Sequence, residues 1–293
     1  MTKIYLNYDQ QALDKEYNLR PLVPHHPQVF DRYLRDSNLV TAKFPCVLDI
    51  AYGSSISQRL DIFSSSNGLG PKPVLVFIHG GYWRNKDKED YRYLAPAYTS
   101  AGVHFVLLNY TLAPKASMDE IVRDNQSALL WLFKNIENYK GDPNRIYIVG
   151  HSAGGHLVAM LLATDWSKFS KGEITKSIIK GGTSISGIFD LEPIMLSYLN
   201  SSLNLDECTV KSNSPIYLTP FSDIPFILTL GGEETKEYHR QQENFHTAWS
   251  KYISDMTVLN MPGLNHYDVV DHLSMPGSAL YNAVFDQIVS DGK

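Results

Sequence analysis

Cysteine is scarce in this sequence, with only Cys46 and Cys208 among 293 residues. The two are far apart, and neither has another cysteine or a histidine nearby at the spacing of a zinc site. This scarcity argues against a disulfide framework and against a zinc centre. It indicates free thiols in a reducing compartment.

Long apolar runs are missing as well. No apolar stretch reaches the roughly 18 residues that a membrane-spanning helix needs. The first residues, MTKIYLNYDQQALDKEYN, do not show the basic-then-apolar order of a signal peptide. We therefore expect a soluble cytoplasmic protein without a membrane partner.

Positive charge is neither abundant nor clustered. The net charge is −5, from 26 Lys and Arg against 31 Asp and Glu, and no basic stripe predicts nucleic-acid binding. The sequence has no H-x-x-x-H motif and no carboxylate cluster, so we expect neither a metal nor a cofactor. The expected partner is a small molecule. The oligomeric state stays open, with a homodimer as one alternative.

From residue 74 onward, short β-rich runs alternate with longer helical patterns. This alternation predicts an α/β fold with a mostly parallel sheet between helices, in one domain that spans 1–293. The apolar runs suit strands buried on both faces. The predicted strands are 74–79, 104–110, 146–150, 178–186, 225–231 and 256–261, and the predicted helices are 87–100, 117–138, 152–164, 237–253 and 276–289.

Three further segments do not follow this rhythm. Residues 1–45 read as an arm laid over the domain, in which Pro21, Pro24 and Pro27 are expected to rule out a regular helix. Residues 44–63 alternate around a turn and predict an antiparallel hairpin at the start of the sheet. Residues 190–223 predict a small helical excursion that covers the site like a cap.

The motif GHSAG, residues 150–154, matches the pattern G-x-S-x-G between an apolar strand and an amphipathic helix. That context predicts a nucleophile elbow with Ser152 at a sharp, strained turn, because glycines let the strand and the helix approach closely. The alternative is a glycine-rich turn in which Ser152 only caps the helix.

A serine nucleophile needs a histidine base and a carboxylate that orients it, in the chain order Ser, acid, His for this fold class. A loop that follows a later strand supplies His266, the best base candidate. The preceding strand ends beside Glu233 and Glu234, only one of which can face the imidazole.

The stretch HGGYW, residues 79–83, follows an early strand. Backbone N–H groups of such a loop, together with the N–H after the nucleophile, stabilise the oxyanion in acyl transfer. We expect these donors at Gly81, Tyr82 and Ala153, with His79 bracing the loop. The alternative is a plain glycine turn followed by two core aromatics.

The segments HGGYW, LNYTLAP, GHSAGGHL, EYHRQ and NHYDVVDHL together resemble the α/β-hydrolase fold. More narrowly, they resemble the kynurenine formamidase (arylformamidase) group of the hormone-sensitive-lipase-like hydrolases. HGGYW matches the HGGxW signature of that group, whose wider relatives usually carry HGGG. The EYHRQ segment resembles the stretch after the family's catalytic acid and implies that this acid is Glu234, where animal members usually carry Asp.

The resemblance implies hydrolysis of N-formyl-L-kynurenine to kynurenine and formate through an acyl-enzyme. Ser152 would attack with His266 as base, and Tyr82 or Trp83 would contact the substrate. A carboxylesterase acting on short-chain or aryl esters is the main alternative. A non-catalytic binding protein of the same fold is disfavoured, because Ser152, Glu234 and His266 are all present.

Overall fold

The computed structural model of the chain describes residues 2–290. The strands are β1 (Cys46–Ala51), β2 (Arg59–Phe63), β3 (Lys72–Ile78), β4 (His104–Leu108), β5 (Gly141–His151), β6 (Ile179–Ile185), β7 (Phe226–Gly231) and β8 (Met256–Met261). Within the described residues they form one eight-stranded sheet in the order β1-β2-β4-β3-β5-β6-β7-β8. β1 and β2 form the predicted antiparallel hairpin, β2 is also antiparallel to β4, and the remaining pairs are parallel.

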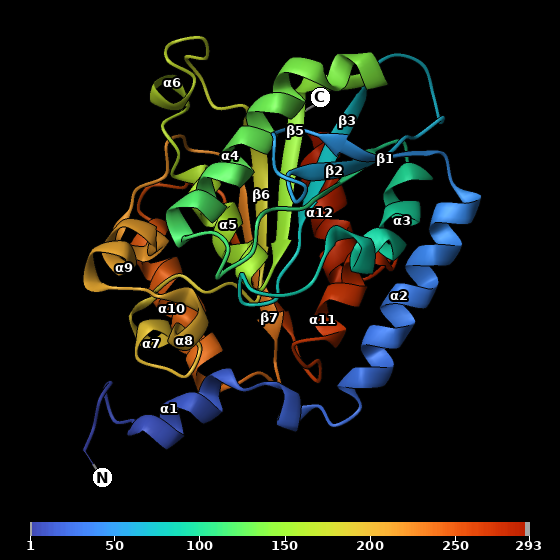
Figure 1. Ribbon diagram of the computed structural model, residues 1–293. Coiled ribbons are helices and arrows are strands. Elements are labelled where there is room, and N and C mark those ends of the chain that lie inside the picture. Colours follow the sequence, from blue (N-terminus) through green and yellow to red (C-terminus); the bar gives the residue numbers. More distant parts are fainter. Residues whose placement is uncertain (1, 291–293) are drawn as a thin grey trace.

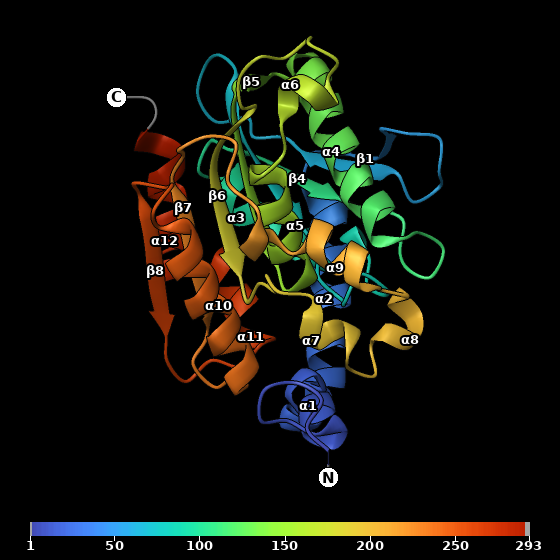
Figure 2. The same ribbon diagram turned by 90° about the vertical axis from the view of Figure 1, so that its left-hand side faces the viewer.

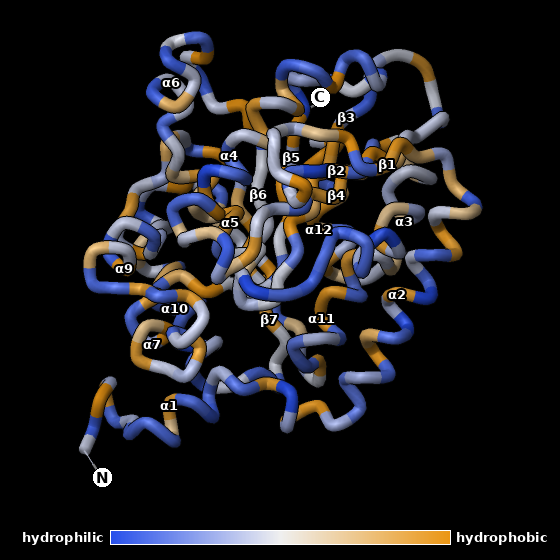
Figure 3. The backbone as a smooth tube through the Cα atoms, in the orientation of Figure 1, coloured by the Kyte–Doolittle hydropathy of each residue, from blue (hydrophilic) through white to orange (hydrophobic). Residues whose placement is uncertain are grey.

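The central strands are buried on both faces, as their continuous apolar sequence predicts. In β3, Val74, Val76 and Ile78 belong to one buried cluster, whereas Leu75 and Phe77 belong to another. Successive side chains of a strand point to opposite faces, so these two clusters are the cores on the two sides of the sheet. Figure 3 shows apolar residues concentrated along the central strands.

Helices cover both cores (Figures 1 and 2). The α-helices are α1 (Gln10–Tyr17), α2 (His26–Lys43), α3 (Ala95–Thr99), α4 (Met118–Asn135), α5 (Ala153–Leu162), α6 (Trp166–Phe169), α7 (Glu192–Met195), α8 (Asn200–Leu203), α9 (Glu207–Asn213), α10 (Lys236–Trp249), α11 (Asp268–Asp271) and α12 (Ala279–Ser290). The 3₁₀ helices are η1 (Arg20–Leu22), η2 (Lys88–Leu94), η3 (Ile136–Tyr139), η4 (Pro215–Tyr217) and η5 (His272–Ser274). Helices α4, α5 and α10 pack on the first cluster, and α2, α3 and α12 pack on the second.

The arm is more regular than its prolines suggest. The prediction that Pro27 rules out a regular helix was wrong, because α2 begins at His26 and continues to Lys43. Pro27 lies in the first turn, where a missing N–H breaks no hydrogen bond and the fixed φ suits the helix. The predicted helix at 87–100 is instead a 3₁₀ helix, η2, followed by the short α3.

The arm and the excursion 190–223 bind each other at one end of the sheet. Tyr198 N donates to Asp14 Oδ1 at 2.8 Å across 184 residues of sequence, and Gln10 Nε2 donates to the Leu196 carbonyl at 3.0 Å. In Figure 1 the blue arm crosses beyond the arrowheads of β5 and β6, which mark the carboxyl ends of these strands. Both predicted additions therefore lie where loops after parallel strands gather. Among residues 2–290, no helix is both long and apolar enough to cross a bilayer.

Candidate active site

Ser152 occupies a sharp turn between two regular elements. β5 ends at His151 and α5 begins at Ala153, while Ser152 itself has φ 59° and ψ −120°. A positive φ is strained for a residue with a side chain. The strain is held in part by a 2.7 Å hydrogen bond from Ser152 N to the Ile185 carbonyl on β6.

Two glycines make this turn possible. A Cβ at Gly150 would lie 2.2 Å from the Gly154 carbonyl oxygen, and a Cβ at Gly154 would lie 2.0 Å from the Ile78 carbonyl oxygen. Both distances are far below van der Waals contact with backbone atoms that cannot easily move. The glycines of GHSAG are therefore required by the close approach of β5, α5 and β3, which is the geometry of a nucleophile elbow.

His266 is paired with Glu234. The His266 Nδ1–H donates to Glu234 Oε2 at 2.6 Å, and the Glu234 side chain is fully buried. Glu234 Oε1 accepts from Gly231 N at 2.8 Å and from Ser186 Oγ at 2.5 Å. These bonds fix the carboxylate, and in the neutral imidazole a proton on Nδ1 makes Nε2 the acceptor. Glu233 is exposed and does not face the imidazole.

Tyr238, which sequence reasoning missed, lies close to Ser152. Its hydroxyl lies 2.9 Å from the Tyr82 hydroxyl, and the Ser152 side chain is among the groups that affect its pKa. Its ring centre lies 5.0 Å from that of His266. Burial raises the pKa of Tyr238 well above its usual value, so the hydroxyl keeps its proton. The sequence feature that could have identified Tyr238 is its position in EYHRQ. It lies four residues after Glu234, in the first turn of α10.

The HGGYW loop has an unusual backbone. Gly81, Tyr82 and Trp83 all have positive φ, at 106°, 50° and 55°. A Cβ at Gly80 would lie 2.6 Å from the His151 carbonyl oxygen, so the loop runs directly against the elbow. Among residues 2–290, no backbone or side-chain acceptor takes the N–H of Gly81, Tyr82 or Ala153, while Gly81 and Tyr82 line the same cavity as Ser152.

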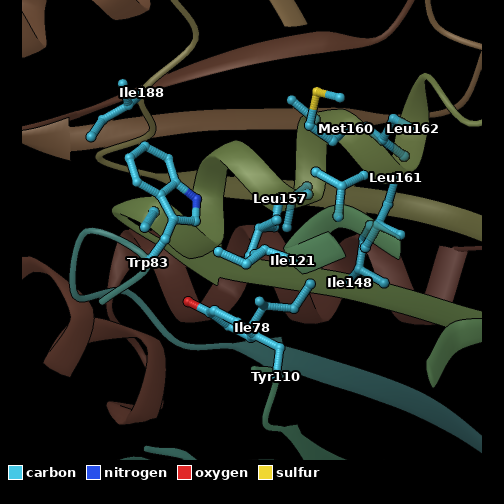
Figure 4. Close-up of a cluster of buried hydrophobic side chains, with 14 of the residues drawn as sticks. Ile78, Trp83, Tyr110, Ile121, Ile148, Leu157, Met160, Leu161, Leu162 and Ile188 are labelled. Carbon is cyan, nitrogen blue, oxygen red and sulfur yellow. The ribbon is translucent and has the colours of Figure 1, made fainter. Parts of the chain in front are cut away.

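The two aromatic residues of the loop, Tyr82 and Trp83, have different environments. Tyr82 lines the cavity, and its hydroxyl donates to the Tyr17 carbonyl at 2.7 Å. The expectation that Trp83 contacts the substrate was wrong for this structure, because Trp83 is fully buried and does not line the cavity. Its indole packs beside Leu157 and Ile188 (Figure 4) and donates to His156 Nδ1 at 3.2 Å.

Two buried histidines support the loop and the elbow. His79 braces the loop as predicted, since its ring nitrogens lie 2.8 Å from the Gly80 carbonyl and 2.9 Å from Asn109 Oδ1. His151 Nε2 lies 2.9 Å from the His266 carbonyl and donates to it. Burial lowers the pKa of His151 well below its usual value, so the ring stays neutral near pH 7.

The cavity that contains Ser152 and His266 has a volume of about 210 Å³. Aromatic side chains contribute to its walls, with Tyr17 and Tyr33 from the arm, Tyr198 from the excursion, and Tyr267 beside His266. A cavity of about 150 Å³ holds benzene. The cavity is therefore large enough for an aryl group.

Known proteins are similar to this chain in sequence and in fold. The sequence profile of the BD-FAE family matches residues 60–248. Kynurenine formamidase of Salmo salar is 30% identical over 233 residues, which cover 78% of this chain and 76% of that protein. An isoprenylcysteine alpha-carbonyl methylesterase of Arabidopsis thaliana is 34% identical over 157 residues, covering 53% of this chain and 37% of that one.

Among solved structures, a candidate thioesterase from Silicibacter sp. superposes with a TM-score of 0.82. The superposition covers 93% of this chain and 98% of that one at 24% identity. At this identity the likeness concerns the fold alone.

Proposed function

Since the chain belongs to the BD-FAE family and to the kynurenine formamidase-like group of α/β-hydrolases, and is a hydrolase, we propose that it is an arylformamidase. Its substrate would be N-formyl-L-kynurenine, which it would hydrolyse to kynurenine and formate in the cytoplasm. One observation carries the chemistry. The buried Glu234 orients His266 in the cavity that also contains the strained Ser152.

The reaction begins with attack of Ser152 Oγ on the formyl carbon. His266 Nε2 takes the hydroxyl proton, and Glu234 stabilises the imidazolium through the 2.6 Å contact with Nδ1. The oxyanion would be held by the N–H groups of Gly81, Tyr82 and Ala153, which have no acceptor in the described chain. Donors that are already oriented cost no reorganisation when the charge develops.

Collapse of the tetrahedral intermediate breaks the C–N bond. His266 gives its proton to the leaving arylamine, and the formyl group stays on Ser152 as an ester. A water molecule then attacks the ester with His266 again as base, releasing formate and restoring the hydroxyl of Ser152. An arylamine is less basic than an alkylamine and leaves more readily, which suits this machinery.

The decisive experiment compares N-formyl-L-kynurenine with p-nitrophenyl acetate on one enzyme preparation. We expect kynurenine to form, and we expect Ser152→Ala to lower both activities by roughly 10⁴-fold or more. Brisk hydrolysis of the ester without formation of kynurenine would reject the formamidase assignment.

A carboxylesterase is the second candidate function. It is favoured by the methylesterase relative, which is 34% identical over 53% of this chain, and a cavity with aromatic walls also accepts aryl esters. The formamidase relative matches 78% of the chain instead. The rates for formyl, acetyl and butyryl esters of one phenol separate the two functions, because a steep fall from formyl to butyryl indicates a tight formyl pocket.

A further inference from the structure

The cavity that contains Ser152 and His266 gathers positive charge. Its lining includes Arg20, Arg84 and Lys86, and no aspartate or glutamate of the described chain lines it. The chain as a whole has a net charge of −5, so the charge of this cavity is opposite in sign to the net charge of the protein. A cleft that concentrates charge of one sign attracts ligands of the opposite sign.

The three cations differ in the hydrogen bonds and ion pairs that they already make within the protein. Arg84 Nη1 donates to Ser202 Oγ at 3.0 Å, and its guanidinium lies 5.7 Å from the centre of the Tyr198 ring. The excursion therefore holds Arg84 in place. Arg20, on η1, is exposed, and within residues 2–290 its guanidinium makes no hydrogen bond or ion pair.

Lys86 follows the HGGYW loop and is only partly neutralised. Its Nζ lies 3.7 Å from Asp90 Oδ2 and 3.5 Å from the centre of the Phe30 ring, and 16% of its side chain is exposed. Burial lowers the pKa of Lys86, and the nearby charge of Arg20 lowers it further, against the opposing effect of Asp90. Arg20 and Lys86 thus line the same cavity and are close enough for the charge of one to affect the other.

An aromatic surface connects the base to these cations. Tyr267 follows His266 directly, and its ring meets the Phe30 ring edge-on at 5.1 Å. Phe30 in turn lies under the Lys86 ammonium. These contacts form a continuous aromatic surface from His266 to Lys86, along which the aryl part of a leaving group could pack.

We infer that Arg20 and Lys86 form a carboxylate-binding subsite, so that the enzyme selects aryl substrates whose leaving group carries a carboxylate. This inference rests on the proposed function in one respect: a formyl group has no side chain, so the carboxylate belongs to the leaving group. A guanidinium holds a carboxylate through paired hydrogen bonds, and an ammonium adds a point charge.

A matched pair of esters tests the subsite. The anion 3-(4-acetoxyphenyl)propionate and the neutral 3-(4-acetoxyphenyl)propionamide share the same acyl group and phenol and differ at the far end. We expect kcat/KM to favour the anion by about 10-fold, mainly through KM, because charge-assisted hydrogen bonds contribute at this scale. Added salt of about 0.5 M should narrow the difference, since it screens the charges.

Variants locate the effect. Arg20→Gln and Lys86→Gln should each bring the ratio of kcat/KM for the anion to kcat/KM for the amide close to one. Arg35→Gln is the matched control, because Arg35 is a cation on the same arm, pairs with its neighbour Asp36 and lies outside the cavity. Equal kcat/KM for the two esters, or variants that slow both esters alike, would overturn the inference.

Binding gives a second measurement that needs no turnover. Calorimetric titration of Ser152→Ala with 3-phenylpropionate and 3-phenylpropionamide should show tighter binding of the anion, by about 10-fold. Equal affinities would reject the subsite. An enzyme that prefers the anions but does not hydrolyse N-formyl-L-kynurenine would retain the subsite and lose the proposed function. Hydrolysis of N-formyl-L-kynurenine without a preference for anions would support the proposed function and reject the subsite.

Discussion

At the scale of single residues, the two adjacent glutamates have different surroundings. The carboxylate of Glu234 is buried against His266, Ser186 and Gly231, while Glu233 is exposed. We predict that Glu234→Gln lowers kcat by roughly 10³- to 10⁴-fold, because an amide no longer holds His266 in the tautomer that accepts the proton of Ser152.

Glu233→Gln is the matched control, with the same change of charge one residue away. Its kcat on an aryl ester should equal that of the wild type. A large loss in Glu233→Gln with little effect in Glu234→Gln would contradict the assignment of the acid.

The hydroxyl of Tyr238 offers a second residue-scale test. It is hydrogen-bonded to the Tyr82 hydroxyl, and Ser152 is close enough to affect its pKa. We predict that Tyr238→Phe lowers kcat by about 10-fold with little change in KM, because the polar group beside Ser152 and its hydrogen bond to Tyr82 are lost. Tyr252→Phe, at a tyrosine that is 44% exposed, should leave both constants unchanged. An unchanged kcat in Tyr238→Phe would show that the hydroxyl only packs.

At the scale of elements, the HGGYW loop is fastened to α5 through Trp83. The indole Nε1 donates to His156 Nδ1, and His156 Nε2 donates to the Asn213 carbonyl at 2.7 Å. We predict that Trp83→Phe lowers the free energy of unfolding by about 1–3 kcal/mol, because a buried acceptor loses its donor. Urea denaturation measures this loss.

The same variant separates the structural role of Trp83 from a role in binding. The KM for an aryl ester should stay within about twofold of the wild type, since Trp83 does not line the cavity. A raised KM without a change in the free energy of unfolding would indicate that Trp83 contacts the substrate.

The elements themselves were predictable to different degrees. β8 has the bounds that its sequence predicts, although this strand lies at the edge of the sheet and only Met261 in it is buried. The bounds of β5 were not predicted, since the strand begins at Gly141 and includes Pro143, whereas the expected start was Ile146. α2 was not predicted from the sequence. A proline is compatible with the first turn of a helix, where Pro27 lies, but it disrupts the later turns.

At the scale of the whole molecule, buried histidines couple folding to pH. Burial lowers the pKa of His156 from 6.5 to about 4. Between these values the unfolded chain binds a proton that the folded chain does not, so stability falls as the pH falls. We predict a loss of roughly 2.5 kcal/mol from this group between pH 7 and pH 4.5.

Urea denaturation at the two pH values tests this coupling. The variant His156→Gln should be less stable at pH 7 but should lose less stability on acidification than the wild type, by roughly the same 2.5 kcal/mol. Equal losses in the two proteins would show that His156 does not titrate in this way. Acidification should also act through His151, whose pKa is lowered in the same direction.

The amino-acid sequence by itself determined the strand and helix rhythm, the elbow at Ser152, and the chain order of Ser152, an acid and His266. These features are local, because periodicity and turn chemistry are properties of a few neighbouring residues. Only the tertiary structure showed that Glu234 and not Glu233 contacts His266, placed Tyr238 near Ser152 and buried Trp83 in the core. The direction of a side chain depends on how its element packs against distant ones. The cavity likewise depends on distant segments, because the arm and the excursion contribute walls to it and are joined by the hydrogen bond between Tyr198 and Asp14, 184 residues apart.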